Sequence, residues 1–287
     1  MKHFFKSTAA VLLALLTVFA LIGCESSKDD PTAVIDIEEN TAAPVTAAPT
    51  GTPAPTEAPT EEPTPSPTPQ PNPARRLVYL TFDDGPYKYT DDVLAVLARY
   101  NVKATFFTVG TQIQKYPEQA KHIAEQGHLL ACHSYSHEMG QTYASLQSFT
   151  DEISRWRQTV IDSVGRDAGA YVMRFPGGTT NTTIGGRNGR DKWVKAANDA
   201  GYYVFDWNMG INDRWLAGNT DNLPKIDYFW ESYKETYAMY KNTDPLILII
   251  HDTEPVSVEL LPRIIEDLLA KGFDFGTCDM IGANYLM

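Results

Sequence analysis

Short apolar runs alternate with longer segments in which apolar residues recur at helical spacing, from residue 77 to residue 275. Both alternating faces of the short runs are apolar, so we expect strands that are covered on both sides, as in a parallel sheet. The expected strands are residues 77–80, 104–107, 129–132, 171–173, 202–205, 246–250 and, more weakly, 273–275.

The segments between these runs carry helix start and stop signals. Thr90 and Asp91 begin one helix, Pro117 opens a second that Gly127 closes, and Gly165 closes a third that begins near residue 148. Later helices are expected at residues 191–200, 223–240 and 257–269. This alternation of strands and helices predicts an α/β fold, either a parallel barrel or a doubly wound sheet.

The first 23 residues differ in character from the rest of the chain. Lys2 and Lys6 precede an uncharged, largely apolar run that ends in Leu-Ile-Gly before Cys24, a pattern typical of an export signal. The ending resembles a bacterial lipobox. This resemblance implies that residues 1–23 are a lipoprotein signal peptide and that Cys24 is lipidated and anchors the chain to the membrane. A transmembrane helix is the alternative, but the run is short for a stable span.

Residues 24–75 form a second distinct segment. Eleven of the 19 prolines fall between Pro44 and Pro73, among Thr, Ala and Glu, and no aromatic residue lies between Glu25 and Pro73. Such a segment cannot bury apolar surface, so we expect a disordered, extended Pro/Thr-rich tether. The folded domain is then residues 76–287.

Charge, cysteine content and missing motifs limit the classes of function that the chain can have. From residue 74 onward there are 21 Lys and Arg against 27 Asp and Glu, with no basic tract, so nucleic acid is not an expected partner. Cys132 and Cys278 could pair in an exported protein or stay reduced. Nucleophile-elbow, dinucleotide and P-loop motifs are missing, which argues against serine-hydrolase and nucleotide chemistry.

Ionisable residues follow five of the expected strands. Since the carboxyl ends of parallel strands lie on one face of the fold, these residues should converge on one cleft. They are Asp83 and Asp84, His133 and His137, Arg174, Asp206, and His251.

The spacing of His133 and His137 suits a metal centre. Two His four apart fall on one side of a helical turn, but the pair alone is a weak signal, and Ser134 stands where a zincin has Glu. A carboxylate from Asp83 or Asp84 would complete the ligand set, while its neighbour faces the substrate.

The remaining strand ends offer further candidates. Arg174 could hold a catalytic carboxylate, and Gly177 permits close approach of a backbone N–H to a ligand. Asp206 could be no more than a helix cap and Trp207 no more than a core residue, but we favour functional roles for both. His251 follows five apolar residues, a position suited to a general acid.

Five ordered motifs, TFDDGP, HSYSH, RFPGG, FDW and IIHD, together resemble the polysaccharide deacetylases of the NodB homology domain, the fourth carbohydrate esterase family. The resemblance covers residues 77–275. It implies a distorted (β/α)7 barrel and a divalent metal, usually Zn²⁺ but also Co²⁺, Mn²⁺ or Ni²⁺.

The same resemblance implies a role for each matching residue. Asp84, His133 and His137 would hold the metal, Asp83 would be the general base and His251 the general acid. Arg174 would position the base and Asp206 would tune the acid. Gly177, Trp207 and Ile249 would contact substrate, although many members have Tyr in place of Gly177 and Leu in place of Ile249.

The implied activity is metal-dependent hydrolysis of N-acetyl groups on a polysaccharide. The anchor and tether would place the enzyme outside the membrane, facing the wall, so we expect N-acetylglucosamine of peptidoglycan as substrate and no protein partner. Exopolysaccharide, chitin oligomers and acetylated xylan are alternatives. A wall-binding lipoprotein without catalysis is a further one, but the presence of both Asp83 and His251 argues against it.

Overall fold

The computed structural model describes residues 75–214 and 226–287. The expected signal segment and all but the last residue of the expected tether lie outside these ranges, as do residues 223–225 of one expected helix. Within the described ranges, no helix is both long enough and apolar enough to cross a membrane.

The core of the domain is a parallel sheet built around one central strand. β1 (Arg76–Asp83) pairs along one side with β7 (Leu246–His251), and along the other first with β8 (Phe273–Gly276) and then with β2 (Thr105–Thr108). The order continues outward from β2 through β3 (Leu129–Cys132), β4 (Gly169–Met173) and β5 (Tyr203–Val204), and from β7 to β6 (Met209–Gly210). All seven expected strands are confirmed, and the curled sheet agrees with the expected distorted (β/α)7 barrel.

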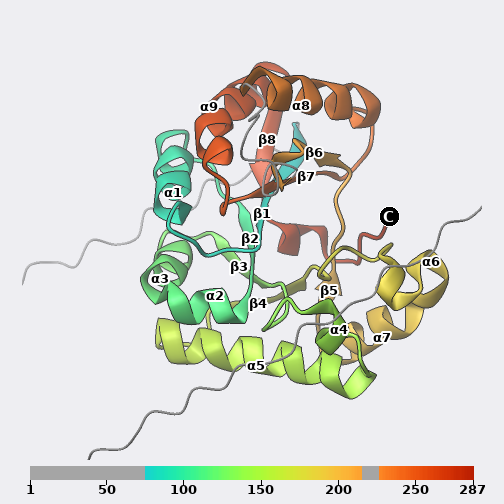
Figure 1. The fold of residues 1–287 in the computed structure, drawn as a ribbon. Helices are drawn as coiled ribbons and strands as arrows, with labels where there is room; N and C mark the ends of the chain where they lie inside the picture. Colours follow the sequence, from blue (N-terminus) through green and yellow to red (C-terminus); the bar gives the residue numbers. More distant parts are fainter. Residues whose placement is uncertain (1–74, 215–225) are drawn as a thin grey trace, which may run out of the picture. The chain divides into compact units, whose positions relative to one another are not determined.

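Helices follow one another around the outside of the strands (Figure 1). The expected helices are present as α1 (Thr90–Arg99), α3 (Pro117–Glu125), α5 (Leu146–Val164), α7 (Asp191–Asp199), α8 (Ile226–Tyr240) and α9 (Pro255–Ala270). Three shorter ones were not expected: α2 (Gly110–Lys115), α4 (Met139–Thr142) and α6 (Gly186–Gly189). Short 3₁₀ turns include η1 (Thr182–Ile184) and η3 (Cys278–Ile281).

Alternation along β1 places its side chains in two separate cores. Val78, Leu80 and Phe82 belong to the large cluster between sheet and helices, whereas Tyr79 belongs to a smaller cluster on the opposite face with Phe107, Val172, Phe205 and Ile247. Both faces are therefore covered, as the apolar runs predict. Because side chains two apart share a face, Thr81 and Asp83 follow Tyr79 onto the inner face of the curled sheet.

Strand register brings the ends of β1 and β7 together. Asp83, the last residue of β1, lies opposite His251, the last residue of β7, and opposite Phe107 of β2. Two ionisable residues that are 168 positions apart in the numbering thus share one edge of the sheet.

Candidate active site

A cavity of about 780 Å³ opens at the carboxyl ends of the strands. It is lined by most of the residues singled out from the sequence, which are Asp83, Asp84, His133, His137, Gly177, Trp207, Ile249 and His251. Arg174 and Asp206 do not line it. Loops after β1, β3, β4, β5 and β7 therefore converge on one site.

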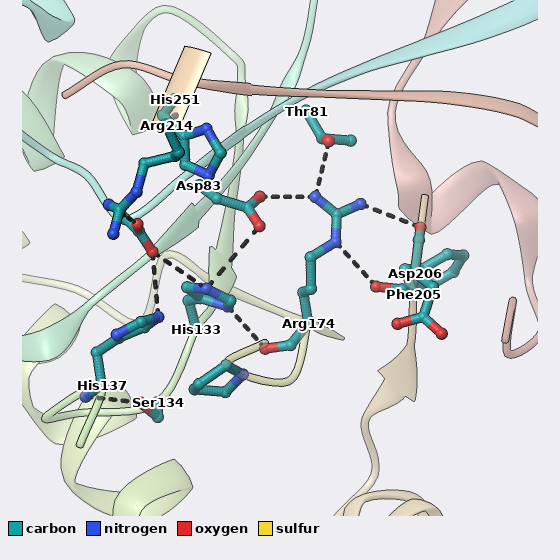
Figure 2. Close-up of polar contacts among 12 residues, drawn as sticks. Thr81, Asp83, His133, Ser134, His137, Arg174, Phe205, Asp206, Arg214 and His251 are labelled. Carbon is teal, nitrogen blue, oxygen red and sulfur yellow. Dashed lines mark hydrogen bonds and ion pairs between the residues drawn. The ribbon is translucent and has the colours of Figure 1, made fainter. Parts of the chain in front are cut away.

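Arg174 lies beside Asp83 and holds its carboxylate (Figure 2). Its Nη1 donates to Asp83 Oδ1 at 2.6 Å and to Thr81 Oγ1 at 2.8 Å. Its Nε and Nη2 donate to the carbonyl oxygens of Phe205 and Asp206 at 2.9 and 3.1 Å. Since the guanidinium is fully buried, this set of acceptors provides the compensation that a buried charge requires.

Asp84 faces the two histidines instead of the arginine. Its Oδ1 lies 3.3 Å from Nε2 of His133 and 3.3 Å from Nε2 of His137. One ligand atom from each of the three residues lies within 4.8 Å of the others. One carboxylate and two imidazoles match the donor set of catalytic sites for zinc and related divalent ions, so these residues fit the expected metal.

Hydrogen bonding and charge prepare the three side chains for a cation. His133 Nδ1 donates to the carbonyl oxygen of Arg174 at 2.8 Å, which fixes the ring with Nε2 on the side of Asp84. Burial, together with the neighbouring His133, lowers the pKa of His137 to about 4. Burial alone would raise the pKa of Asp84, but the hydrogen bond with His133 and the nearby imidazoles hold it well below its usual range. Asp84 is therefore ionised and His137 is neutral at neutral pH.

The segment that carries the two histidines is not the helical turn expected from their spacing. Residues 133–137 form an irregular loop in which Ser134 and His137 have positive φ values of 65° and 61°. The helical prediction is wrong because local hydrogen bonds favour another conformation: the His137 N–H donates to Ser134 Oγ, and the carbonyl oxygens of Ser134 and Tyr135 accept from the first N–H groups of α2.

Glu152, a residue that the sequence analysis overlooked, supports this loop from α5. Its Oε2 accepts from the N–H of Tyr135 at 3.0 Å and from the N–H and hydroxyl of Ser136 at 2.7 and 2.9 Å. The residue is 2% exposed. A sequence signal was available, since Glu152 interrupts the apolar face of its helix between Phe149 and Trp156.

His251 is held by Asp213 and not by Asp206, so the expected partner of the general acid is corrected. Asp213 Oδ1 accepts from His251 Nδ1 at 2.9 Å, and Oδ2 accepts from the His251 N–H at 2.7 Å and from Ser257 Oγ at 2.9 Å. Burial favours the neutral imidazole, but Asp213, with Asp83 and Asp84 nearby, raises the pKa of His251 overall. Asp213 follows the two-residue strand β6, which is too short to leave a periodic signal.

The Asp206 carboxylate instead forms hydrogen bonds with Thr179, in the loop after β4, and with Met287. Oδ1 accepts from the N–H of Thr179 at 2.9 Å, and Oδ2 accepts from the Thr179 hydroxyl and, at 2.9 Å, from the N–H of Met287. Asp206 is connected to the catalytic groups by its backbone carbonyl oxygen, which accepts a hydrogen bond from Arg174. Asp206 thus shapes the loop that contains Gly177.

The expected substrate contacts all line the cavity, and Arg214 joins them. Gly177 has a φ of 76°, a conformation that favours glycine and that a Tyr would adopt only with strain. Trp207 and Ile249 supply apolar wall. Arg214, which no sequence motif marks, forms an ion pair through Nη1 with Asp84 Oδ2, the carboxylate oxygen that does not face the histidines.

The two cysteines of the domain are buried and free. Cys132 lies in the outer core and Cys278 in the inner one, on opposite faces of the sheet. Of the two alternatives left open by the sequence, the structure shows the reduced pair.

Comparison with known proteins matches residues 70–205 to the family described as polysaccharide deacetylase. The chain is 28% identical over 201 residues to a peptidoglycan-N-acetylglucosamine deacetylase of Bacillus cereus, covering 70% of this chain and 68% of that one. It is 25% identical to the peptidoglycan-N-acetylmuramic acid deacetylase PdaA of Bacillus subtilis, covering 71% and 70%.

A solved structure shows the same fold at higher identity. The catalytic domain of peptidoglycan N-acetylglucosamine deacetylase from Eubacterium rectale superposes with a TM-score of 0.61 at 32% identity, covering 71% of this chain and 89% of that one. The similarity therefore extends over nearly all of the described domain.

Replacing Asp213 tests its control of His251. In Asp213→Asn the burial of His251 remains while the stabilising negative charge is lost, so the imidazolium should lose its proton at lower pH. We expect the alkaline limb of the kcat/KM profile on an acetylated glycan to move to lower pH. Asp206→Asn should leave the position of that limb unchanged, and a shift in Asp206→Asn alone would contradict the assignment.

Replacing Glu152 tests its support of the histidine loop. Glu152→Ala leaves the N–H groups of Tyr135 and Ser136 without their acceptor, so we expect cation affinity to fall about 10- to 100-fold in a chelator competition. Glu152→Gln, which keeps an acceptor oxygen, should lose less. Asp151→Ala, at an exposed position of the same helix, is the control. Unchanged affinity in a folded Glu152→Ala variant would refute this role.

Proposed function

Because this chain belongs to the polysaccharide deacetylase family, we propose that it removes N-acetyl groups from peptidoglycan N-acetylglucosamine and releases acetate. The observation that carries the proposal is the placement of Asp83, His251 and the Asp84, His133 and His137 cluster around one cavity. A base, an acid and a metal site at one substrate-sized opening are what amide hydrolysis requires.

We assign the cation to Asp84, His133 and His137, with zinc as the preferred ion and Co²⁺, Mn²⁺ or Ni²⁺ as substitutes. When bound, such an ion supplies Lewis-acid polarisation of the acetamide carbonyl and lowers the pKa of water. Arg214 pairs with Oδ2 of Asp84 and so leaves Oδ1 directed at the two imidazoles. Hydrogen-bonded metal carboxylates of this kind hold their orientation.

The protein's own groups then divide the proton transfers. Arg174 occupies Oδ1 of Asp83, which leaves Oδ2, 3.8 Å from His133 Nε2, on the cavity side to accept a proton from the attacking water. His251, with Nδ1 bound to Asp213, presents Nε2 to the leaving amine and donates its proton there. The raised pKa of His251 favours the protonated form that this step consumes.

Substrate groups are assigned to the cavity wall. The backbone N–H of Gly177 serves as a donor to the developing oxyanion, and Trp207 and Ile249 enclose the acetyl methyl. Peptidoglycan is favoured as the substrate by the names of the Bacillus cereus and Eubacterium rectale relatives.

Location follows from the first 75 residues. We propose that residues 1–23 are a lipoprotein signal peptide, that Cys24 is lipidated, and that residues 24–75 tether the deacetylase domain, residues 76–287, to the outer face of the membrane. The roughly thirty Pro-rich residues of this tether would reach on the order of 100 Å, which suits a substrate in the wall.

Acetate release from a panel of glycans tests the proposed substrate. Peptidoglycan fragments, chitin oligomers, acetylated exopolysaccharide and acetylated xylan should be offered at equal acetyl concentration. We expect the highest kcat/KM on peptidoglycan fragments. Activity on xylan but not on wall fragments would overturn the assignment of peptidoglycan as the substrate. If no glycan releases acetate, the result would support a wall-binding protein without catalysis instead.

Two substitutions test the division between base and metal ligand. Asp83→Asn should keep the cation and lose about 10²- to 10⁴-fold in kcat, the usual contribution of acid–base catalysis. His133→Ala should lose both cation and activity. Asp91→Asn, an acid outside the cavity, is the control for activity and for cation content by atomic absorption. Full activity in the Asp83→Asn variant would refute the assignment of Asp83 as the general base.

A further inference from the structure

Asp252 is a buried carboxylate that the proposed reaction does not use. It directly follows His251, the last residue of β7, and it has no exposed surface. Because Asp83 and His251 are paired at the ends of β1 and β7, the segments that follow these two strands leave the sheet side by side. We propose that Asp252 is a positioning residue, which holds the turn after β1 and thereby directs the Asp84 carboxylate at the cation site. The inference rests on the assignment of the cation to Asp84 in the proposed function.

The Asp252 carboxylate packs directly against the backbone of Gly85, the neighbour of Asp84. A Cβ atom at position 85 would lie 2.3 Å from each of the two carboxylate oxygens, so only glycine permits this close approach. The carbonyl oxygen of Gly85 accepts from the N–H of Val109, which follows β2, at 2.8 Å. The residue after Asp84 is therefore in contact with both Asp252 and the segment after β2.

A hydrogen bond with Thr90 fixes the other end of the same turn. The buried Thr90 hydroxyl donates to Asp252 Oδ2 and accepts from the N–H of Tyr87 at 2.7 Å. The Thr90 N–H in turn donates to the carbonyl oxygen of Tyr87 at 3.0 Å. Because a hydroxyl has a single proton, its donation to Asp252 leaves the oxygen free to accept from Tyr87. Asp252 thus contacts the turn of residues 85–90 at both of its ends.

The surroundings of Asp252 do not favour a carboxylate, which argues that it is present for function and not for stability. Its Oδ1 is buried and forms no hydrogen bond within residues 75–214 and 226–287. Burial raises the pKa of Asp252 to about 7 despite the hydrogen bond from Thr90. Buried polar atoms without a partner destabilise a fold and are uncommon. Where proteins keep such unfavourable groups, a functional site is the usual reason.

The turn that Asp252 contacts controls the direction of the Asp84 side chain. Asp84 has a φ of 70°, a conformation that is uncommon for residues other than glycine and that persists only where neighbouring contacts maintain it. The contacts of Gly85 and Thr90 with Asp252 maintain it from the C-terminal side. Without them the backbone can relax, and Asp84 Oδ1 then loses its position 3.3 Å from each of the two imidazole Nε2 atoms.

The Zn²⁺ affinity of full-length variants, measured by chelator competition, tests this role. We expect Asp252→Ala to raise the Kd for Zn²⁺ about 10- to 100-fold, the usual effect of removing a group that orients a metal ligand. Asp252→Asn keeps an oxygen that can accept from Thr90, so its Kd should stay close to that of the parent. Thr90→Val removes the hydroxyl with little change of shape and should weaken Zn²⁺ binding, whereas Thr90→Ser should restore it.

A double variant and a stability control separate positioning from a general loss of stability. In Asp252→Ala combined with Thr90→Val, the Kd for Zn²⁺ should be close to that of Asp252→Ala alone, because the same hydrogen bond is lost only once. Ile123→Ala removes a buried core side chain of α3 outside the main cavity. It should lower Tm and leave the affinity for Zn²⁺ unchanged.

Unchanged Zn²⁺ affinity in a folded Asp252→Ala variant would overturn the proposal, and so would additive losses in the double variant. An equal loss of affinity in Ile123→Ala would show that Asp252 acts only through stability. If Asp252→Ala does not fold, the two Thr90 variants decide, and equal Kd values for Thr90→Val and Thr90→Ser would refute the role. If the parent protein binds no Zn²⁺, the cation assignment of the proposed function fails, and this inference fails with it.

Discussion

The buried ion pair between Arg174 and Asp83 is the constraint on which the rest of the site depends. A guanidinium with no exposed surface must be surrounded by acceptors, and its acceptors come from Thr81 and Asp83 of β1 and from the residues that follow β5. Removing one partner of such a pair leaves an uncompensated buried charge, which costs about 3–5 kcal/mol. The strand ends are therefore held in one arrangement by a single side chain.

This constraint also explains why two adjacent acids have different surroundings. Asp83 is the last residue of β1 and points inward with Tyr79 and Thr81, where Arg174 meets it. Asp84 has a φ of 70°, so the backbone turns and sends its carboxylate toward His133 and His137. Each carboxylate has its own positive or hydrogen-bonding partners, so both can lie in one cavity.

Much of this arrangement could be predicted from the sequence because it depends on periodicity and on strand ends. Apolar runs located all the larger strands, and parallel pairing then required Asp83, His133, Arg174 and His251 to meet at one face. The inner and outer cores, read from alternation alone, were also confirmed by the burial of Tyr79 and Leu80 on opposite faces.

The errors arose where tertiary contacts override local pattern. Asp206 has the expected place after a strand, but its carboxylate turns to Thr179 while Asp213, seven residues later, reaches His251. The histidine spacing indicated a helix, yet Glu152 and the N-terminus of α2 supply hydrogen bonds that stabilise a loop. Neither partner is near in sequence, so no local rule identifies it.

The central claim is that hydrolysis depends on a cation held by Asp84, His133 and His137. The most direct measurement is acetate release from wall fragments by cation-free protein during a zinc titration, with bound zinc counted in the same samples. We predict no activity without the cation and a rise that saturates at one ion per chain. Full acetate release after every divalent cation has been removed would contradict the account.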